Sequence, residues 1–276
     1  MNITVVGLGL IGGSFCKVIS RMTEHKCYGM DINSDVIHSA IAQKAIIDKA
    51  EDVSQSDLTI ICLYPEATIE FILNNCEKFK RGSIVIDSCG IKKAITEKVS
   101  EKLLKCGVTF IGAHPMAGRE FSGFDYSVPE LFENASLILT PDENADEEKI
   151  SIVRNLAYQL SFKKVVVTTP EEHDRIISYT SQLAHIVSSA YIKSPTAQEQ
   201  SGFSAGSFKD LTRVARLNEN MWTSLFLLNK ENLISEISLI IDNLNDYKNA
   251  LESSDSETLN SLLKEGRILK EKSMEL

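Results

Sequence analysis

The chain has 276 residues and a mass of 30.6 kDa, a length at which one hydrophobic core usually gives way to two domains. Apolar residues make up 43% and charged residues 24%, a globular composition that excludes wholesale disorder. The net charge of −9 argues against partners that are bound through basic surfaces, namely nucleic acids and anionic membranes. No apolar run approaches the roughly 20 residues of a membrane helix.

The N-terminal sequence and the cysteines bear on the cellular compartment. The apolar residues 3–15 are interrupted by glycines and have no basic segment before them, so we expect no signal peptide. The six cysteines show no C-x-x-C spacing, and the five histidines show no metal-ligand spacing. These features predict a cytoplasmic protein with reduced, mostly buried thiols and no metal site.

The first part of the chain alternates short β-branched runs with longer helical patterns. Continuous apolar strands separated by helices are typical of a parallel sheet that is covered on both faces. Residues 1–168 are therefore predicted to form an α/β Rossmann-type domain. The strand patterns cover residues 3–6, 27–30, 58–62, 83–86, 109–111, 136–139 and 164–167. The helical patterns cover residues 9–22, 34–43, 66–79, 91–104 and 147–160.

The pattern changes at Thr169. The run T-P-E-E at 169–172 has the form of a capping box with proline at the first helical position, and no strand pattern follows it. An all-α C-terminal domain is therefore predicted over residues 169–276, with its boundary uncertain by about 10 residues. Its helical patterns cover residues 170–192, 208–217, 221–251 and 256–271.

The predicted long helix over residues 221–251 has an apolar stripe. Its members recur at alternating spacings of three and four residues, as in a heptad repeat. They are Ile234, Ile237, Ile241, Leu244 and Leu251. Such a stripe packs either within its own domain or against a second subunit, and the sequence leaves both possibilities open.

Residues 7–12 read G-L-G-L-I-G and connect the first predicted strand to the first predicted helix. That context is the one expected of a dinucleotide-binding turn. Gly7 permits the tight turn, Gly9 lets the backbone approach a pyrophosphate, and Gly12 allows the helix to pack closely on the strand. Free N–H groups at the helix N-terminus stabilise the phosphates. The remaining positions of this predicted cofactor site are Leu8, Leu10 and Ile11.

Asp31 ends the second predicted strand, where a carboxylate would bind the ribose hydroxyls of NAD. A 2′-phosphate within about 4 Å of that carboxylate would cost ~4 kcal/mol at an effective dielectric constant near 20. The next three residues, Ile-Asn-Ser, supply no arginine to compensate. The predicted cofactor is therefore NAD and not NADP.

His114 follows the strand pattern of residues 109–111 in the segment G-A-H-P-M-A-G. The carboxyl ends of parallel strands line the ligand crevice, so His114 should point into it. Pro115 favours an extended backbone at His114. A neutral imidazole can accept a hydroxyl proton while hydride leaves the same carbon. The alternative is a loop histidine that is bonded to the backbone.

Two further polar groups lie on predicted helices of the second domain. His185 lies on the side of its helix opposite to the apolar stripe, which is either a solvated surface or a cleft wall that holds a polar substrate. Arg213 shares a helical face with Lys209 and Arg216, and Ser207 is the predicted N-cap of that helix. These cations either attract an anion or pair with nearby acids.

Four segments of the chain are distinctive when they are taken together. They are V-V-G-L-G-L-I-G at 5–12, G-A-H-P-M-A-G at 112–118 with S-G at 122–123, S-Q-L-A-H at 181–185 and F-K-D-L-T-R at 208–213. In this order and spacing they resemble the prephenate dehydrogenase family, bacterial enzymes of tyrosine biosynthesis. The resemblance covers nearly the whole chain. The first segment is common to many dehydrogenases, whereas the second and fourth together are much more specific.

The resemblance implies NAD-dependent oxidative decarboxylation of prephenate to 4-hydroxyphenylpyruvate by a homodimer built on the helical domain. It implies that His114 is the catalytic histidine at the ring hydroxyl, that His185 binds substrate and that Arg213 holds a substrate carboxylate. The segment D-S-C-G-I-K at 87–92 departs from a common family pattern, which has a serine at the position of Gly90. That serine helps to orient the histidine, so here its role is either missing or filled by Ser88 or a water molecule.

Three alternatives remain at this point. Arogenate dehydrogenase differs only in the amino group of its substrate, which an acid such as Glu120 would favour. A β-hydroxyacid dehydrogenase would use a helical lysine such as Lys209 after Gly206, but that leaves the His114 segment unexplained. The third alternative is a non-catalytic NAD-sensing dimer.

Overall fold

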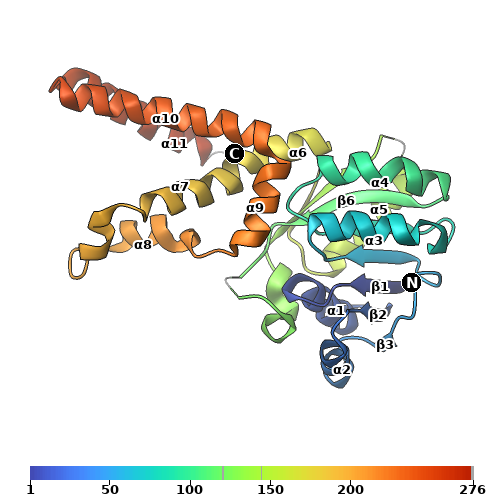
Figure 1. The fold of residues 1–276 in the computed structure, drawn as a ribbon. Coiled ribbons are helices and arrows are strands. Elements are labelled where there is room, and N and C mark those ends of the chain that lie inside the picture. Colours follow the sequence, from blue (N-terminus) through green and yellow to red (C-terminus); the bar gives the residue numbers. More distant parts are fainter. Residues whose placement is uncertain (120, 144, 275–276) are drawn as a thin grey trace. The chain divides into compact units, whose positions relative to one another are not determined.

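The structure is a computed structural model that describes residues 1–119, 121–143 and 145–274. The chain divides into two compact units, Met1–Asn229 and Lys230–Leu276. The first unit contains the sheet and the helices up to α9, and the second contains α10 and α11 (Figure 1). Glu120 lies outside the described residues.

The first unit is built on one sheet with the strand order β3-β2-β1-β4-β5-β6-β7-β8. Its strands are β1 (Asn2–Val6), β2 (Lys26–Met30), β3 (Asp48–Lys49), β4 (Leu58–Ile61), β5 (Ile84–Asp87), β6 (Thr109–Pro115), β7 (Ser136–Pro141) and β8 (Lys164–Val167). The sequence analysis located every strand except the two-residue β3. It ended the sixth strand at residue 111, whereas β6 continues through Pro115.

The expectation of a wholly parallel sheet is wrong at one pair. β6 and β7 run antiparallel, with His114 opposite Ile138, whereas the other neighbouring strands are parallel. A parallel return requires a crossover, usually a helix. The described residues between β6 and β7 form only two short 3₁₀ turns, Phe124–Tyr126 and Pro129–Phe132. The described part of the β6–β7 connection therefore contains no crossover α-helix.

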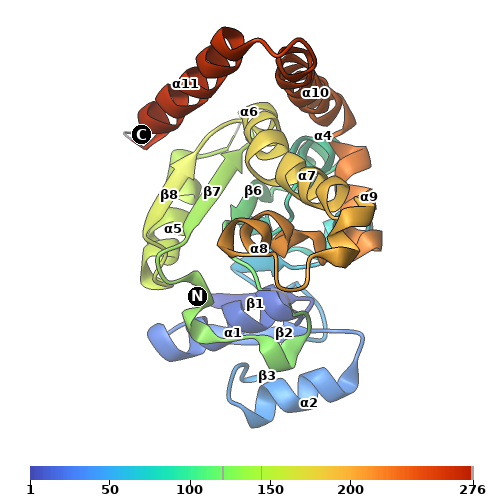
Figure 2. The ribbon, with the colours of Figure 1, turned by 90° about the vertical axis from the view of Figure 1, so that its left-hand side faces the viewer.

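Two hydrophobic clusters cover the two faces of this sheet. One includes buried residues of α1 (Leu10–Met22), α2 (Ser34–Ala42) and α5 (Glu147–Gln159). The other includes buried residues of α3 (Pro65–Asn75) and α4 (Lys93–Lys105). Successive side chains of a strand point to opposite faces, so Val5 joins the first cluster and Val6 the second. Figure 2 shows α1 and α2 on the side of the sheet away from α4.

The helices after β8 begin at the predicted cap. The Thr169 hydroxyl accepts a hydrogen bond from the Glu172 N–H at 3.2 Å, and Pro170 is the first residue of α6 (Pro170–Ile177). The single helix predicted over 170–192 contains a π-helical turn, Ser178–Leu183, before α7 (Ala184–Tyr191). π-Turns inside helices occur frequently at functional sites. This turn lies between His173 and His185.

The predicted helices after α7 differ from the observed ones at three points. Helix α8 (Gly206–Thr212) has Ala205 as its N-cap, with no side-chain cap bond, so the prediction of Ser207 is wrong. A short 3₁₀ turn, Arg213–Ala215, follows α8 and packs against α7. The helix predicted over 221–251 is interrupted at Asn229, which separates α9 (Glu219–Leu228) from α10 (Lys230–Glu252).

The second unit is a pair of helices, α10 and α11 (Ser256–Ser273), that pack on each other. Asp255 caps α11 by accepting hydrogen bonds from the N–H groups of Glu257 and Thr258. The apolar stripe predicted from the heptad spacing lies on α10 and is largely exposed in the single chain. For example, Ile234 is 60% and Leu244 is 62% exposed. None of the helices in the described ranges is long and apolar enough to cross a membrane.

Candidate functional site

The glycine-rich turn after β1 has the geometry of a phosphate cradle. Gly7 has φ of +83°, which glycine adopts without strain, and its N–H donates to the Met30 carbonyl at 2.8 Å. A Cβ on Gly12 would lie 1.9 Å from the Gly7 carbonyl oxygen, so only glycine fits there. A Cβ on Gly9 would meet no atom within 4 Å. The turn is therefore closed on its strand side and open where a pyrophosphate would lie.

Helix α1 begins beside this open position. Its N-cap, Gly9, makes no side-chain cap bond, and the first turn contains no acidic residue. Uncapped N–H groups and the positive end of the helix dipole favour an anion there. Asp31 at the end of β2 accepts hydrogen bonds from the N–H groups of Leu8 at 2.7 Å and Asn33 at 2.9 Å. These residues fit a dinucleotide with a free ribose diol.

His114 lies near the carboxyl end of β6, within the strand and not in a loop after it. Its Nδ1 is 2.9 Å from Nε2 of His173, a residue of α6 that is 59 positions later in the chain. The Nδ1 of His173 is in turn 2.7 Å from Oδ1 of Asp174. Three side chains thus form one hydrogen-bonded series that ends at His114.

Asp174 is tied to the start of α4. Its two carboxylate oxygens accept hydrogen bonds from the backbone N–H groups of Lys92 at 2.9 Å and Lys93 at 3.0 Å. The side-chain amide of Asn229 donates to the backbone carbonyl of Asp174 and to Gln182, both at 2.8 Å. Asp174 therefore joins helices that lie far apart in the sequence.

A buried ion pair lies under His114. The Lys92 ammonium donates to the Asp87 carboxylate and to the Ala113 carbonyl, the latter at 2.7 Å. Asp87 also accepts hydrogen bonds from the N–H groups of Ala113 at 3.1 Å and Cys89 at 3.0 Å. The side chains of Lys92 and Asp87 are 1% and 0% exposed. This pair fixes the strand end of β6 against the loop that contains Gly90.

The surroundings of His114 keep its imidazole neutral. Burial lowers the pKa of His114 well below its ordinary value, and the adjacent His173 and Lys92 lower it further. Burial also lowers the pKa of His173, although the Asp174 carboxylate acts in the opposite direction. A neutral imidazole has one nitrogen that can accept a proton, so His114 is suited to general-base chemistry.

Gly90 lies against the other nitrogen of His114. A Cβ built on Gly90 would be 3.7 Å from His114 Nε2 and 3.9 Å from Cδ1 of Leu225. The residue at position 90 therefore faces the nitrogen that His173 does not occupy. Because glycine has no side chain, residue 90 leaves the space beside Nε2 of His114 open.

His185 lies on α7, just after the π-turn. Its Nδ1 donates to the Ser181 carbonyl at 2.9 Å, and its ring stacks on the Trp222 indole, with 3.8 Å between centroids. Burial lowers the pKa of His185, the hydrogen bond to Ser181 raises it, and the nearby Arg213 guanidinium lowers it. The structure thus brings His185 and Arg213 close together, a proximity that the sequence analysis did not predict.

Helix α9 connects this group with His114. Trp222, which stacks on His185, and Leu225, which lies at Gly90, are three residues apart and so share one helix face. The sequence analysis missed Trp222, His173, Asp174 and Asn229. The adjacent His-Asp pair at 173–174 was the available signal, but nothing local shows that it meets His114.

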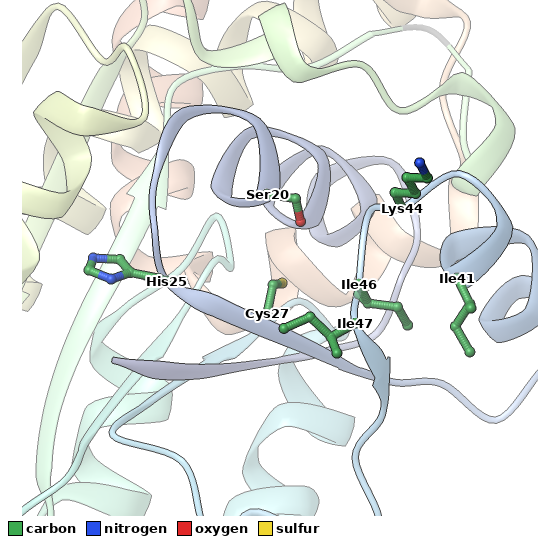
Figure 3. Close-up of a pocket in the computed structure, with 7 residues that line it drawn as sticks. All are labelled: Ser20, His25, Cys27, Ile41, Lys44, Ile46 and Ile47. Atoms are coloured by element: carbon green, nitrogen blue, oxygen red, sulfur yellow. The ribbon is translucent and has the colours of Figure 1, made fainter.

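A separate hollow of about 370 Å³ lies by the amino end of β2. It is lined by Ser20, His25, Cys27, Ile41, Lys44, Ile46 and Ile47, and Figure 3 shows His25 and Lys44 on opposite sides of it. Ligands in open α/β sheets bind at the carboxyl ends of the strands, so this hollow lies at the wrong edge for the crevice.

The family models of prephenate dehydrogenase match most of the chain. The nucleotide-binding domain of that family matches residues 16–168, and its dimerization domain matches residues 169–265. The chain belongs to the prephenate dehydrogenase family. The fold agrees with this family assignment, because an α/β sheet unit with a nucleotide-binding turn is followed by helices.

Several members of this family are similar to nearly the whole of this chain. Prephenate dehydrogenase of Bacillus subtilis is 29% identical over 94% of this chain and 72% of its own. The crystal structure of prephenate dehydrogenase from Aquifex aeolicus, in complex with hydroxyphenyl propionate and NAD+, is 29% identical with a TM-score of 0.87. That comparison covers 99% of this chain and 98% of the other. Arogenate dehydrogenase of Synechocystis is 26% identical with a TM-score of 0.81, over 99% and 100% of the two chains.

Proposed function

We propose that this protein is an NAD-dependent prephenate dehydrogenase, which converts prephenate to 4-hydroxyphenylpyruvate and carbon dioxide. The observation that supports this most directly is the position of His114. A neutral imidazole at the carboxyl end of β6 lies at the same sheet edge as the glycine-rich turn. The similarity to relatives named prephenate dehydrogenase supports the substrate.

The cofactor site is proposed to be the turn after β1 together with Asp31. Its backbone positions are Gly7, Leu8, Gly9, Leu10, Ile11 and Gly12. When NAD is bound, it supplies the acceptor for the hydride. The open space at Gly9 and the uncapped start of α1 accommodate the pyrophosphate, and Asp31 accepts hydrogen bonds from the ribose hydroxyls.

His114 is proposed to be the catalytic base. Its Nε2 accepts the proton of the ring hydroxyl as the carbon that bears this hydroxyl is oxidised to a ketone. Loss of the ring carboxylate as carbon dioxide then sends the electron pair of the broken C–C bond through the ring to the ketone oxygen. This makes the ring aromatic, and the resulting phenolate takes up a proton to become the phenol. The lowered pKa of His114 keeps the base unprotonated near neutral pH.

His185 and Arg213 are proposed to bind the substrate. The Arg213 guanidinium forms a planar fork that suits a carboxylate. The Nδ1 of His185 is occupied by the Ser181 carbonyl, which leaves Nε2 for a polar group of the substrate. Trp222 supports the His185 ring from one face. The two side chains would hold the substrate carboxylates away from the reacting carbon.

The helical part is proposed to form a homodimer in the cytoplasm, with a domain boundary at residues 168–169. The exposed stripe on α10 and the match to the family's dimerization domain support the dimer. Sedimentation at micromolar concentration should give about twice 30.6 kDa. A monomer that does not depend on concentration would overturn the dimer.

The test of the function compares prephenate, arogenate and simple hydroxyacids at equal concentration, with reduction of NAD+ followed by absorbance. We expect the highest kcat/KM with prephenate. His114→Asn should retain NAD affinity and lose ~10²–10⁴-fold in turnover, the usual contribution of a general acid–base group. Turnover near the wild-type rate in this variant would show that His114 is not the base.

A further inference from the structure

The hydrogen bonds of Asp174 determine where its neighbours hold their protons. Asp174 and His173 are 2% and 1% exposed, so their protons are held by protein groups. Both carboxylate oxygens of Asp174 accept backbone N–H bonds, from Lys92 and Lys93, so both oxygens act as hydrogen-bond acceptors. An ionised carboxylate only accepts, so the Nδ1 of His173 carries a proton and donates it to Asp174.

The protonation of His173 determines that of His114. A neutral His173 with its proton on Nδ1 has a bare Nε2, which is 2.9 Å from Nδ1 of His114. Nδ1 of His114 must therefore carry a proton, and Nε2 of His114 is left as the acceptor. That nitrogen is the one beside Gly90 and the space at position 90.

We propose that His173 and Asp174 are positioning residues that fix the tautomer and the orientation of His114, so that its Nε2 is always the base. This inference rests on the proposed role of His114. It also accounts for the glycine at position 90. A serine there would touch His114 at Nε2, whereas His173 holds the ring from Nδ1 and leaves Nε2 to the substrate.

Two substitutions at His173 separate this role from general packing. The Oε1 of His173→Gln lies as many bonds from Cα as Nε2 of histidine, so it can accept from His114. The side chain of His173→Asn is shorter by one bond, so it reaches Asp174 and not His114. Both variants keep a polar side chain that can donate to Asp174 or its surroundings, and they differ in the acceptor offered to His114.

We expect His173→Asn to lower kcat about 10- to 100-fold. This range corresponds to the free-energy cost of leaving one buried hydrogen-bonding group without a partner. KM for prephenate and the affinity for NAD should stay within threefold, and His173→Gln should retain most of the wild-type kcat. Equal loss in the two variants, with circular dichroism showing both folded, would overturn the proposal. So would wild-type kcat in His173→Asn.

A second measurement does not depend on turnover. Long-range 1H–15N NMR correlations of the histidine side chains, assigned with His114→Asn, report which ring nitrogen of His114 carries the proton. We expect Nδ1–H in the wild-type protein and in His173→Gln, and Nε2–H in His173→Asn. An Nε2–H tautomer in the wild type would refute the proposal. Because no substrate is needed, this measurement could support or refute the positioning role of His173 and Asp174 even if the protein failed to oxidise prephenate.

Discussion

The imidazole of His185 stacks on the indole of Trp222, with the ring planes inclined at 30°. Its Nδ1–H is held by the Ser181 carbonyl, so the ring is fixed from one face and one edge. Since Trp222 lies one helical turn before Leu225, the same helix that supports His185 also reaches Gly90 beside His114. Helix α9 thus supports the proposed substrate-binding histidine through Trp222 and places Leu225 at Gly90, the neighbour of the proposed catalytic histidine.

The first prediction concerns the cofactor. Asp31 should give NAD at least a hundredfold preference over NADP in kcat/KM. This figure discounts the ~4 kcal/mol repulsion between a carboxylate and a 2′-phosphate for solvent screening. Asp31→Ser removes the charge and should narrow the ratio at least tenfold. Steady-state kinetics with both cofactors measures the ratio, and comparable efficiency of the wild type with NADP would show that Asp31 has another role.

The second prediction concerns pH. Burial lowers the pKa values of His114 and His173 in the folded protein. As pH decreases, the two histidines are therefore protonated in the unfolded chain at a higher pH than in the folded protein. The unfolded state then binds more protons, and the free energy of unfolding decreases as pH falls below about 6.5, the ordinary histidine value. This loss continues until the lowered pKa values of the folded state are reached.

Urea denaturation at pH 7.5, 6.5 and 5.5 checks this dependence, and His114→Gln should flatten it. The activity should also decrease as pH falls, because His114 must be neutral to act as a base. The acid limb of kcat/KM should therefore have its midpoint below about 6.5. A midpoint above that value would contradict a buried neutral His114.

The third prediction concerns the buried ion pair. Lys92→Met leaves the Asp87 carboxylate without its charged partner in a fully buried site, which should lower the free energy of unfolding by about 3–5 kcal/mol. Lys93→Met is the matched control. That side chain is 50% exposed and lies 3.8 Å from Glu97, so its loss should cost less than about 1 kcal/mol. Similar free energies of unfolding of the two variants in urea would mean that the other hydrogen bonds of Asp87 stabilise its carboxylate without Lys92.

The fourth prediction compares two glycines. Gly90→Ser should fold and should change the free energy of unfolding by less than about 1 kcal/mol, because its Cβ would meet neighbours at 3.7 Å or more. Gly12→Ala would place a Cβ 1.9 Å from the Gly7 carbonyl and should destabilise the turn and weaken NAD binding. Thermal unfolding and NAD titration measure both. Equal tolerance of the two changes would show that the turn is not closely packed.

Local patterns in the sequence were sufficient to predict the elements that form the proposed cofactor site. The β-branched run before Gly7 and the carboxylate after β2 depend on residues that are close in the chain. The antiparallel pairing of β7 with β6 was not predictable in this way, because it depends on contacts between two strands that are distant in the chain. The interruption at Asn229 likewise depends on hydrogen bonds to Asp174 and Gln182, which are distant in sequence.

In the candidate site, too, features that depend on local sequence were predictable and contacts between distant residues were not. His114, His185 and Arg213 were singled out by their place on predicted elements and by the family resemblance. The contact between His114 and His173 joins residues 59 positions apart, and no periodicity encodes it. Gly90 was recognised as a departure from the family pattern, but its distance to Nε2 of His114 became visible only in three dimensions.

The last prediction concerns Arg213, and it rests on charge. Prephenate is a dianion and the chain has a net charge of −9, so long-range attraction cannot gather the substrate and local cations must do so. Arg213 is the cation whose charge reaches His185, which places it beside the proposed substrate-binding group. Arg213→Ala should therefore raise KM for prephenate strongly and change kcat less, since the carboxylate contact is felt about equally in the ground and transition states.

The size of that effect follows from the contact that is lost. A charge-assisted bidentate bond should be worth ~2–4 kcal/mol, or roughly 30- to 1,000-fold in KM. Lys209→Ala and Arg216→Ala serve as controls, because the same exposed segment holds all three cations. Steady-state kinetics with varied prephenate separates KM from kcat, and NAD affinity should stay unchanged in each variant. If KM of Arg213→Ala stayed within threefold of wild type while either control raised it, the carboxylate would be bound by the other cation.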